Sequence, residues 1–120
     1  MVNKRIAERH HATFEGIRQQ DEEGNEFWLA RPLAKVLDYS EYRHFLPVLE
    51  RAREACRNSE QAVENHFEEI LEMVEIGSGA KRELPDVRLS RYACYLIVQN
   101  GDPSKPVIAS SVIPAQAGIQ

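Results

Sequence analysis

The 120 residues, 42% hydrophobic and 28% charged, fit one globular domain and leave little room for two. Fifteen basic residues against nineteen acidic ones give a formal net charge of −4, which argues against a protein that coats nucleic acid by charge alone. Because no apolar run approaches the roughly 20 residues of a membrane-spanning helix and the N-terminus lacks the apolar stretch of a secretory signal, we expect a cytoplasmic protein with no membrane partner.

A β-hairpin is predicted at the start of the domain. Segment 13–19 is short and partly alternating, residues 21–25 supply turn chemistry, and the apolar run 26–29 follows. Pro32 stands where proline favours the first turn of a helix, since its missing N–H would be unpaired there anyway. We expect that short helix to end near residues 38–40.

A longer helix is expected next. Ser40 is placed to cap it, and apolar residues recur at steps of three and four toward Arg57. Pro47 must either kink this helix or lie in its first turn, because it lacks the N–H donor and clashes with the preceding turn.

The acidic run, residues 60–75, is predicted to form a further helix. Every charged residue in it is a glutamate. Asn58 and Gln61 have the spacing of a capping box, and an apolar stripe with helical spacing lies opposite the glutamates. The stripe consists of Val63, Phe67, Ile70, Leu71 and Val74.

The C-terminal part is predicted to hold a second hairpin and a last helix. Residues 77–79, Gly-Ser-Gly, favour a turn between two strands. Ser90 is placed as the N-cap of a helix over 91–99. Cys56 and Cys94 lie far apart in segments that read as helical, so we expect reduced, partly buried thiols.

Two features are typical of contacts with DNA. The helices 31–37 and 41–57 have the approximate size of a helix-turn-helix, although any helical hairpin packed on a sheet shows the same pattern. The loop 77–82 combines glycines with basic residues but lacks the ending of a P-loop, so it either grips a DNA backbone or is a plain exposed turn. The residues that we expect to bind DNA are Lys35, Tyr42, Arg43, His44, Lys81, Arg82, Arg88 and Arg91; Tyr42 and His44 are the candidates for groups near the bases.

The acidic run offers an alternative function. In this hypothesis Glu64, Glu68 and Glu72 form one face of an acidic helix that docks on a basic partner, such as a recombination protein or a repressor. The four histidines have no spacing that builds a metal site, and the carboxylates lack the apolar setting that raises a pKa for catalysis. We therefore expect no metal, no cofactor and no catalytic residue.

Three strings of sequence carry a resemblance to a known family. They are FWLARPLAKVLDY at 27–39, VEIGSGAKREL at 74–84 and LSRYACYLIVQNGDP at 89–103. Over about residues 10–109 the chain resembles the N-terminal part of the bacterial DNA-damage-inducible protein D family. The leading domain of that family belongs to the BRO-N group, which is also found in phage and viral antirepressor-like proteins.

The resemblance implies an α+β, BRO-N-like domain of two short β-hairpins packed against about four helices. This domain would occupy 13–109, after an N-terminal arm at 1–12 and before a non-family tail at 110–120. The implied function is that of a DNA-binding accessory protein of the SOS response, with no known catalytic residues. Because family members continue past residue 109, we expect a truncated protein. Neither the strandedness of the DNA nor the oligomeric state follows from the sequence.

Overall fold

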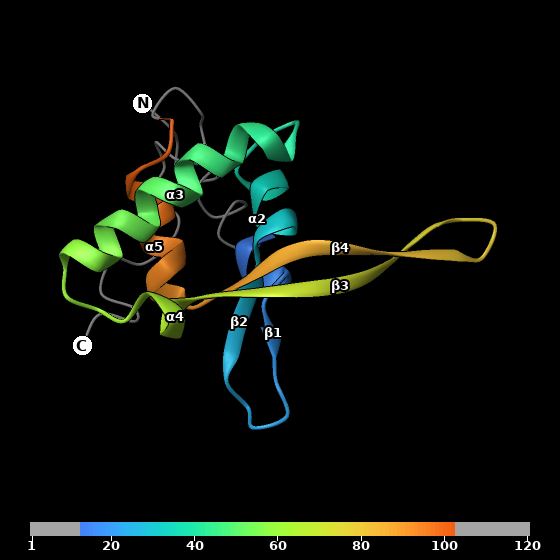
Figure 1. Cartoon of the computed structure of the whole chain (residues 1–120), viewed down its shortest axis with the longest axis horizontal. Coiled ribbons are helices and arrows are strands. Elements are labelled where there is room, and N and C mark those ends of the chain that lie inside the picture. The colour runs from blue at the N-terminus through green and yellow to red at the C-terminus, as the bar shows by residue number, and fades with distance from the viewer. Residues whose placement is uncertain (1–12, 103–120) are drawn as a thin grey trace.

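A computed structural model describes residues 13–102, which form a mixed arrangement of helices and one antiparallel sheet (Figure 1). The elements are β1 (Gln19–Gln20), β2 (Glu26–Leu29), α2 (Ala30–Val36), α3 (Tyr42–Asn58), α4 (Val63–His66), β3 (Phe67–Gly77), β4 (Ala80–Leu89) and α5 (Arg91–Gln99). The strands lie in the order β1-β2-β4-β3. The α+β class expected from the sequence is confirmed. No helix within 13–102 is long and apolar enough to cross a membrane.

The two hairpins project from the helices in different directions. Helices α3 and α5 pack together and α2 lies beside them, while the far part of the β3–β4 hairpin extends beyond every helix (Figure 1). This second hairpin is much longer than expected, with strands of 11 and 10 residues. The first hairpin is present, but its first strand is shorter than predicted, because residues 13–16 are helical and β1 contains only two residues.

The core forms where α3, α5 and the near ends of β2 and β4 meet. Trp28 is fully buried and stacks on Phe14, with ring centroids 4.5 Å apart. The indole Nε1 of Trp28 donates a hydrogen bond to the carbonyl oxygen of Phe14 over 2.9 Å, which satisfies the polar end of this buried ring. Cys56 and Cys94 are both free and fully buried, whereas the sequence predicts partly buried thiols.

The acidic run is a strand and not a helix. Only its first part forms the short helix α4, and from Phe67 onward the chain pairs with β4 along almost its whole length. The apolar stripe has helical spacing, and in the strand its residues fall on both faces, Phe67 and Leu71 on one and Ile70 and Val74 on the other. Pairing with β4 decides the structure, because it places Glu75 opposite Lys81 and Glu68 opposite Arg88, and opposite charges stabilise such cross-strand pairs.

Helix α3 begins and continues differently from the prediction. Its N-cap is Glu41, whose backbone is extended and whose side chain makes no capping hydrogen bond, so the predicted cap at Ser40 is wrong. Pro47 lies inside the helix, beyond its first turn. Asn58 is the last residue of α3 and does not cap a following helix.

Helix α5 has the N-cap that the sequence predicts. The Oγ of Ser90 accepts a hydrogen bond from the backbone N–H of Ala93 over 3.0 Å, and the helix ends at Gln99. The same Oγ lies 2.6 Å from Nδ1 of His66, whose ring packs edge-on against Tyr92. His66 is therefore a half-buried packing residue, and burial lowers its pKa.

Replacing Ser90 tests this cap. We expect Ser90→Ala to lower the free energy of unfolding by about 1 kcal/mol, because the first turn of α5 loses its acceptor. Urea denaturation followed by the fluorescence of Trp28 measures the change. Ser90→Thr, which keeps a hydroxyl, should lose less; equal losses for the two variants would contradict a capping role.

Candidate nucleic-acid interface

The basic loop 77–82 lies at the far end of the β3–β4 hairpin. Gly77, Ser78 and Gly79 all have positive φ, at 108°, 51° and 77°, and glycine at two of these three positions allows the tight turn. Lys81 and Arg82 follow directly on β4 and are exposed. Neither forms an ion pair within residues 13–102, although Glu75 faces Lys81 across the hairpin.

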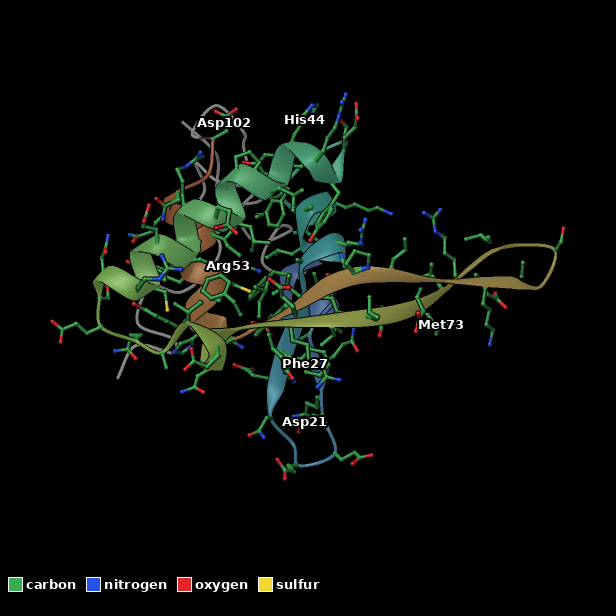
Figure 2. All side chains as sticks on the ribbon, in the orientation of Figure 1. Asp21, Phe27, His44, Arg53, Met73 and Asp102 are labelled. Carbon is green, nitrogen blue, oxygen red and sulfur yellow. The ribbon has the colours of Figure 1, made fainter. Side chains whose placement is uncertain are left out.

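The residues predicted on the helix pair lie in a different part of the molecule. Lys35 is exposed on α2, and Tyr42 is half-buried with the guanidinium of Arg31 over its ring, 4.2 Å from the centroid. Arg43 and His44 are exposed at the start of α3, where Arg43 forms an ion pair of 2.7 Å with Glu41. Figure 2 shows His44 well away from the end of the hairpin.

A groove brings part of the helix pair next to the hairpin. Its volume is about 560 Å³, and both parts of the molecule contribute to its wall. The helix side includes Lys35 and Tyr42, and the hairpin side includes Met73 and Leu84. The structure therefore brings Lys35 and Tyr42 beside the middle of the hairpin, whereas Lys81 and Arg82 lie near its far end.

Arg91, which we expect to bind DNA, is bonded to two carboxylates within the fold. Its guanidinium bonds to both carboxylate oxygens of Glu26, at 2.9 and 3.0 Å, and to Glu15 at 3.1 Å. The side chain is only 15% exposed, and it lies 5.0 Å from the ring centroid of Trp28. Two carboxylates neutralise this charge, so Arg91 holds α5 against β2.

Arg88 is also engaged within the fold. Its guanidinium lies 4.5 Å from the ring centroid of Phe27, and the residue is half-buried. Its backbone position is opposite Leu29 on one side and Glu68 on the other. Of the predicted basic contacts, Lys35, Arg43, Lys81 and Arg82 therefore remain exposed to solvent.

Asp86 and Arg31, which the sequence analysis missed, fix the base of the hairpin. The buried Asp86 carboxylate accepts hydrogen bonds from the backbone N–H groups of Arg31, at 3.1 Å, and Val87, at 2.8 Å. Nε of Arg31 donates to the carbonyl oxygen of Pro85 over 2.8 Å. The sequence signal for this site is an aspartate between apolar residues in segment 84–87. A carboxylate that is buried in such a segment needs hydrogen-bond donors around it.

The predicted acidic helix face does not exist as such. Glu64 lies on α4, whereas Glu68 and Glu72 lie on β3. Residues an even number apart on a strand share a face, so Glu68 and Glu72 lie on the same side of the hairpin, with Ile70 between them. The surface that could receive a basic partner is therefore the strand β3.

Within residues 13–102 no group of three or more histidine, cysteine or acidic side chains is placed to hold a metal ion. Burial raises the pKa of the Cys56 and Cys94 thiols. Both therefore stay protonated at neutral pH, which disfavours a role as nucleophile or ligand.

Comparison with known proteins gives two matches. A family model described as "BRO family, N-terminal domain" matches residues 16–114. The DNA damage-inducible protein D of Escherichia coli (strain K12) is 64% identical over 101 residues, which cover 84% of this chain and 37% of that protein. The chain thus spans little more than a third of the length of this curated relative. No solved structure matches the chain.

Acid titration tests the structural role of Arg91. Hydrogen bonds from Arg91 hold the pKa of Glu26 below its usual value of 4.5. Because the folded pKa lies below the unfolded one, this contribution to stability is present above about pH 4.5 and is lost as the pH falls through the folded pKa. We expect Glu26→Gln to lower the free energy of unfolding at pH 7 by about 1–3 kcal/mol and to flatten its acid dependence.

Denaturant unfolding at a series of pH values from 3 to 7 measures both effects. Glu22→Gln, in the exposed loop between β1 and β2, is the matched control and should change neither. Coincident acid profiles for the native chain and Glu26→Gln would contradict the assignment.

Proposed function

Because this chain belongs to the BRO family, whose N-terminal domain it contains, we propose that it is a DNA-binding accessory protein of the bacterial SOS response that acts in the cytoplasm without catalysis. The matched relative is by name a DNA damage-inducible protein, and 64% identity over 101 residues supports the same setting for this chain. The proposal concerns the matched domain, since the chain spans 37% of that relative.

The observation that carries the proposal is the β3–β4 hairpin, which projects from the helices (Figure 1) and has Lys81 and Arg82 exposed near its end. A two-stranded antiparallel ribbon is one of the elements that fit the major groove of DNA. At roughly 3.3 Å per residue, a strand as long as β4 reaches well beyond the helices. Two basic side chains at that end contact phosphates and position the ribbon on the duplex.

The exposed residues of the helix pair supply further contacts in this proposal. Lys35, in the groove beside the middle of the hairpin, meets a phosphate of the same duplex. Arg43 contacts phosphate by exchanging its surface ion pair with Glu41, which costs little because exposed pairs contribute little. Tyr42 and His44 are the candidates for groups near the bases. Arg88 and Arg91 contribute only through the fold.

Reversing the charge at the hairpin end tests the proposal. If Lys35, Arg43, Lys81 and Arg82 each meet one phosphate, log affinity should fall with log salt at a slope near −3.6, at about 0.9 per contact. Lys81→Glu combined with Arg82→Glu should weaken binding and reduce the slope to about −1.8. Fluorescence anisotropy with labelled duplex, single-stranded and forked DNA at several salt concentrations measures affinity and slope.

The matched control is Arg51→Glu combined with Arg57→Glu. Both residues are exposed on α3, and the change in net charge is the same. This variant should keep most of the affinity and the original slope. If the two double variants lose equal affinity for DNA, net charge alone explains the loss. A salt slope near zero for the native chain would contradict phosphate contacts altogether.

A further inference from the structure

Strand β3 lies at the edge of the sheet. In the described part of the chain it pairs with β4 on one side and with no strand on the other. Its 11 residues therefore offer a row of backbone N–H and C=O groups along the outer side. Such an edge is a template for pairing with another extended chain unless it is covered or blocked.

The same strand carries most of the exposed large hydrophobic side chains of the described residues. Within residues 13–102, the large hydrophobic side chains that are exposed are Leu46, Leu71, Met73 and Ile76, with Leu71 63% exposed and Met73 59% exposed. Three of the four belong to β3. Figure 2 shows Met73 on the hairpin away from α3, and the residue also lines the groove shared with α2. Apolar side chains gathered on an unpaired edge indicate an interaction site more often than chance exposure.

Beside this edge, a groove lined by both strands of the hairpin has room for apolar side chains, and Pro85 and Val87 of β4 contribute to its wall. It has a volume of about 720 Å³ and lies between α3 and the hairpin. Leu46 and Leu49 line it from α3, and Ile70 and Leu71 line it from β3. Arg53 lies at its wall, paired with Glu50 at 2.9 Å and with Glu69 at 3.3 Å (Figure 2). The apolar wall thus adjoins the unpaired edge.

The charge of β3 restricts what can pair with it. The strand contains four glutamates, Glu68, Glu69, Glu72 and Glu75, and no lysine or arginine. DNA phosphates are repelled by this edge. A second copy of the chain would bring four further glutamates against the first four, and like charges directly opposite destabilise a strand pair. A strand that combines apolar residues with basic residues opposite positions 68, 69, 72 and 75 matches both the charges and the groove.

From these observations we propose that the outer edge of β3 binds an extended, basic segment of a partner protein by β-pairing. Its apolar side chains enter the groove beside Leu71, and its lysines or arginines face the glutamates of β3. The glutamates of this surface lie on β3, whereas the basic residues proposed for DNA lie on β4, so separate variants test the two proposals.

A designed peptide tests the proposal on the full chain. In antiparallel register the peptide VKVIKVVKK places its four lysines opposite the four glutamates and its apolar residues opposite the other positions from 70 to 76. We expect measurable binding by fluorescence anisotropy. The charge-reversed peptide VEVIEVVEE should bind at least about tenfold more weakly.

Two further peptides and variants separate β-pairing from adsorption by charge. A VKVIKVVKK peptide N-methylated at alternate residues, on the side that faces β3, cannot donate backbone hydrogen bonds and should also bind at least about tenfold more weakly. Glu72→Lys combined with Glu75→Lys should weaken binding of the lysine peptide and strengthen binding of the glutamate peptide. Glu22→Lys combined with Glu23→Lys, in the exposed loop after β1, has the same charge change and should alter neither.

Three results would overturn the proposal. If N-methylation does not weaken binding, the peptide is held by charge alone and not by β-pairing. If no binding is seen at millimolar peptide, the edge of β3 does not bind such a segment. A concentration-dependent dimer of the native chain in sedimentation, abolished by Leu71→Lys, would assign the edge to a second copy. Loss of DNA binding in the variants of the hairpin end leaves this result unaffected, so failure of one proposal does not imply failure of the other.

Discussion

The position of the β3–β4 hairpin depends on the buried carboxylate of Asp86. This carboxylate accepts a hydrogen bond from the first turn of α2 through the N–H of Arg31, and Arg31 in turn donates to the carbonyl oxygen of Pro85 and covers the ring of Tyr42. A buried acceptor that lost its donors would remain desolvated at a cost of about 1–3 kcal/mol. The junction therefore keeps the hairpin at a fixed direction to the helices, and both grooves that adjoin it depend on this direction.

The two strands of the hairpin carry different charges. On β4 the exposed basic residues Lys81 and Arg82 lie near the turn, whereas the deeper Arg88 is stacked on Phe27. On β3 every charged residue is a glutamate. Glu75 and Lys81 face each other across the hairpin. Such a pair of opposite charges offsets part of the repulsion among the like charges on each strand. One ribbon can thus present a basic end and an acidic edge.

Local signals in the sequence predicted the elements that depend on local chemistry. Ser90 marked the start of α5, Pro32 lies in the first turn of α2, and the glycines at 77 and 79 marked the hairpin turn. Most of the strand β3 was predicted to be helical, because its structure comes from pairing with residues up to 22 positions away, from Phe67 to Leu89. The partner of Arg91 could not be predicted for the same reason. Glu26, which neutralises it, lies 65 residues earlier, and no spacing rule reveals such a pair.

The two proposed surfaces share one ribbon, and this has a consequence for their energetics. A basic segment on β3 would neutralise glutamates that lie within a strand spacing of Lys81 and Arg82, and so would remove repulsion between the hairpin end and DNA phosphates. Binding at the edge would then favour binding at the end, and thermodynamic linkage requires the reverse effect to be equal. Because exposed charges are screened beyond about 8–10 Å at physiological salt, only the glutamate nearest the turn, Glu75, contributes strongly. The coupling is therefore modest, and it is concentrated at the pair Glu75–Lys81.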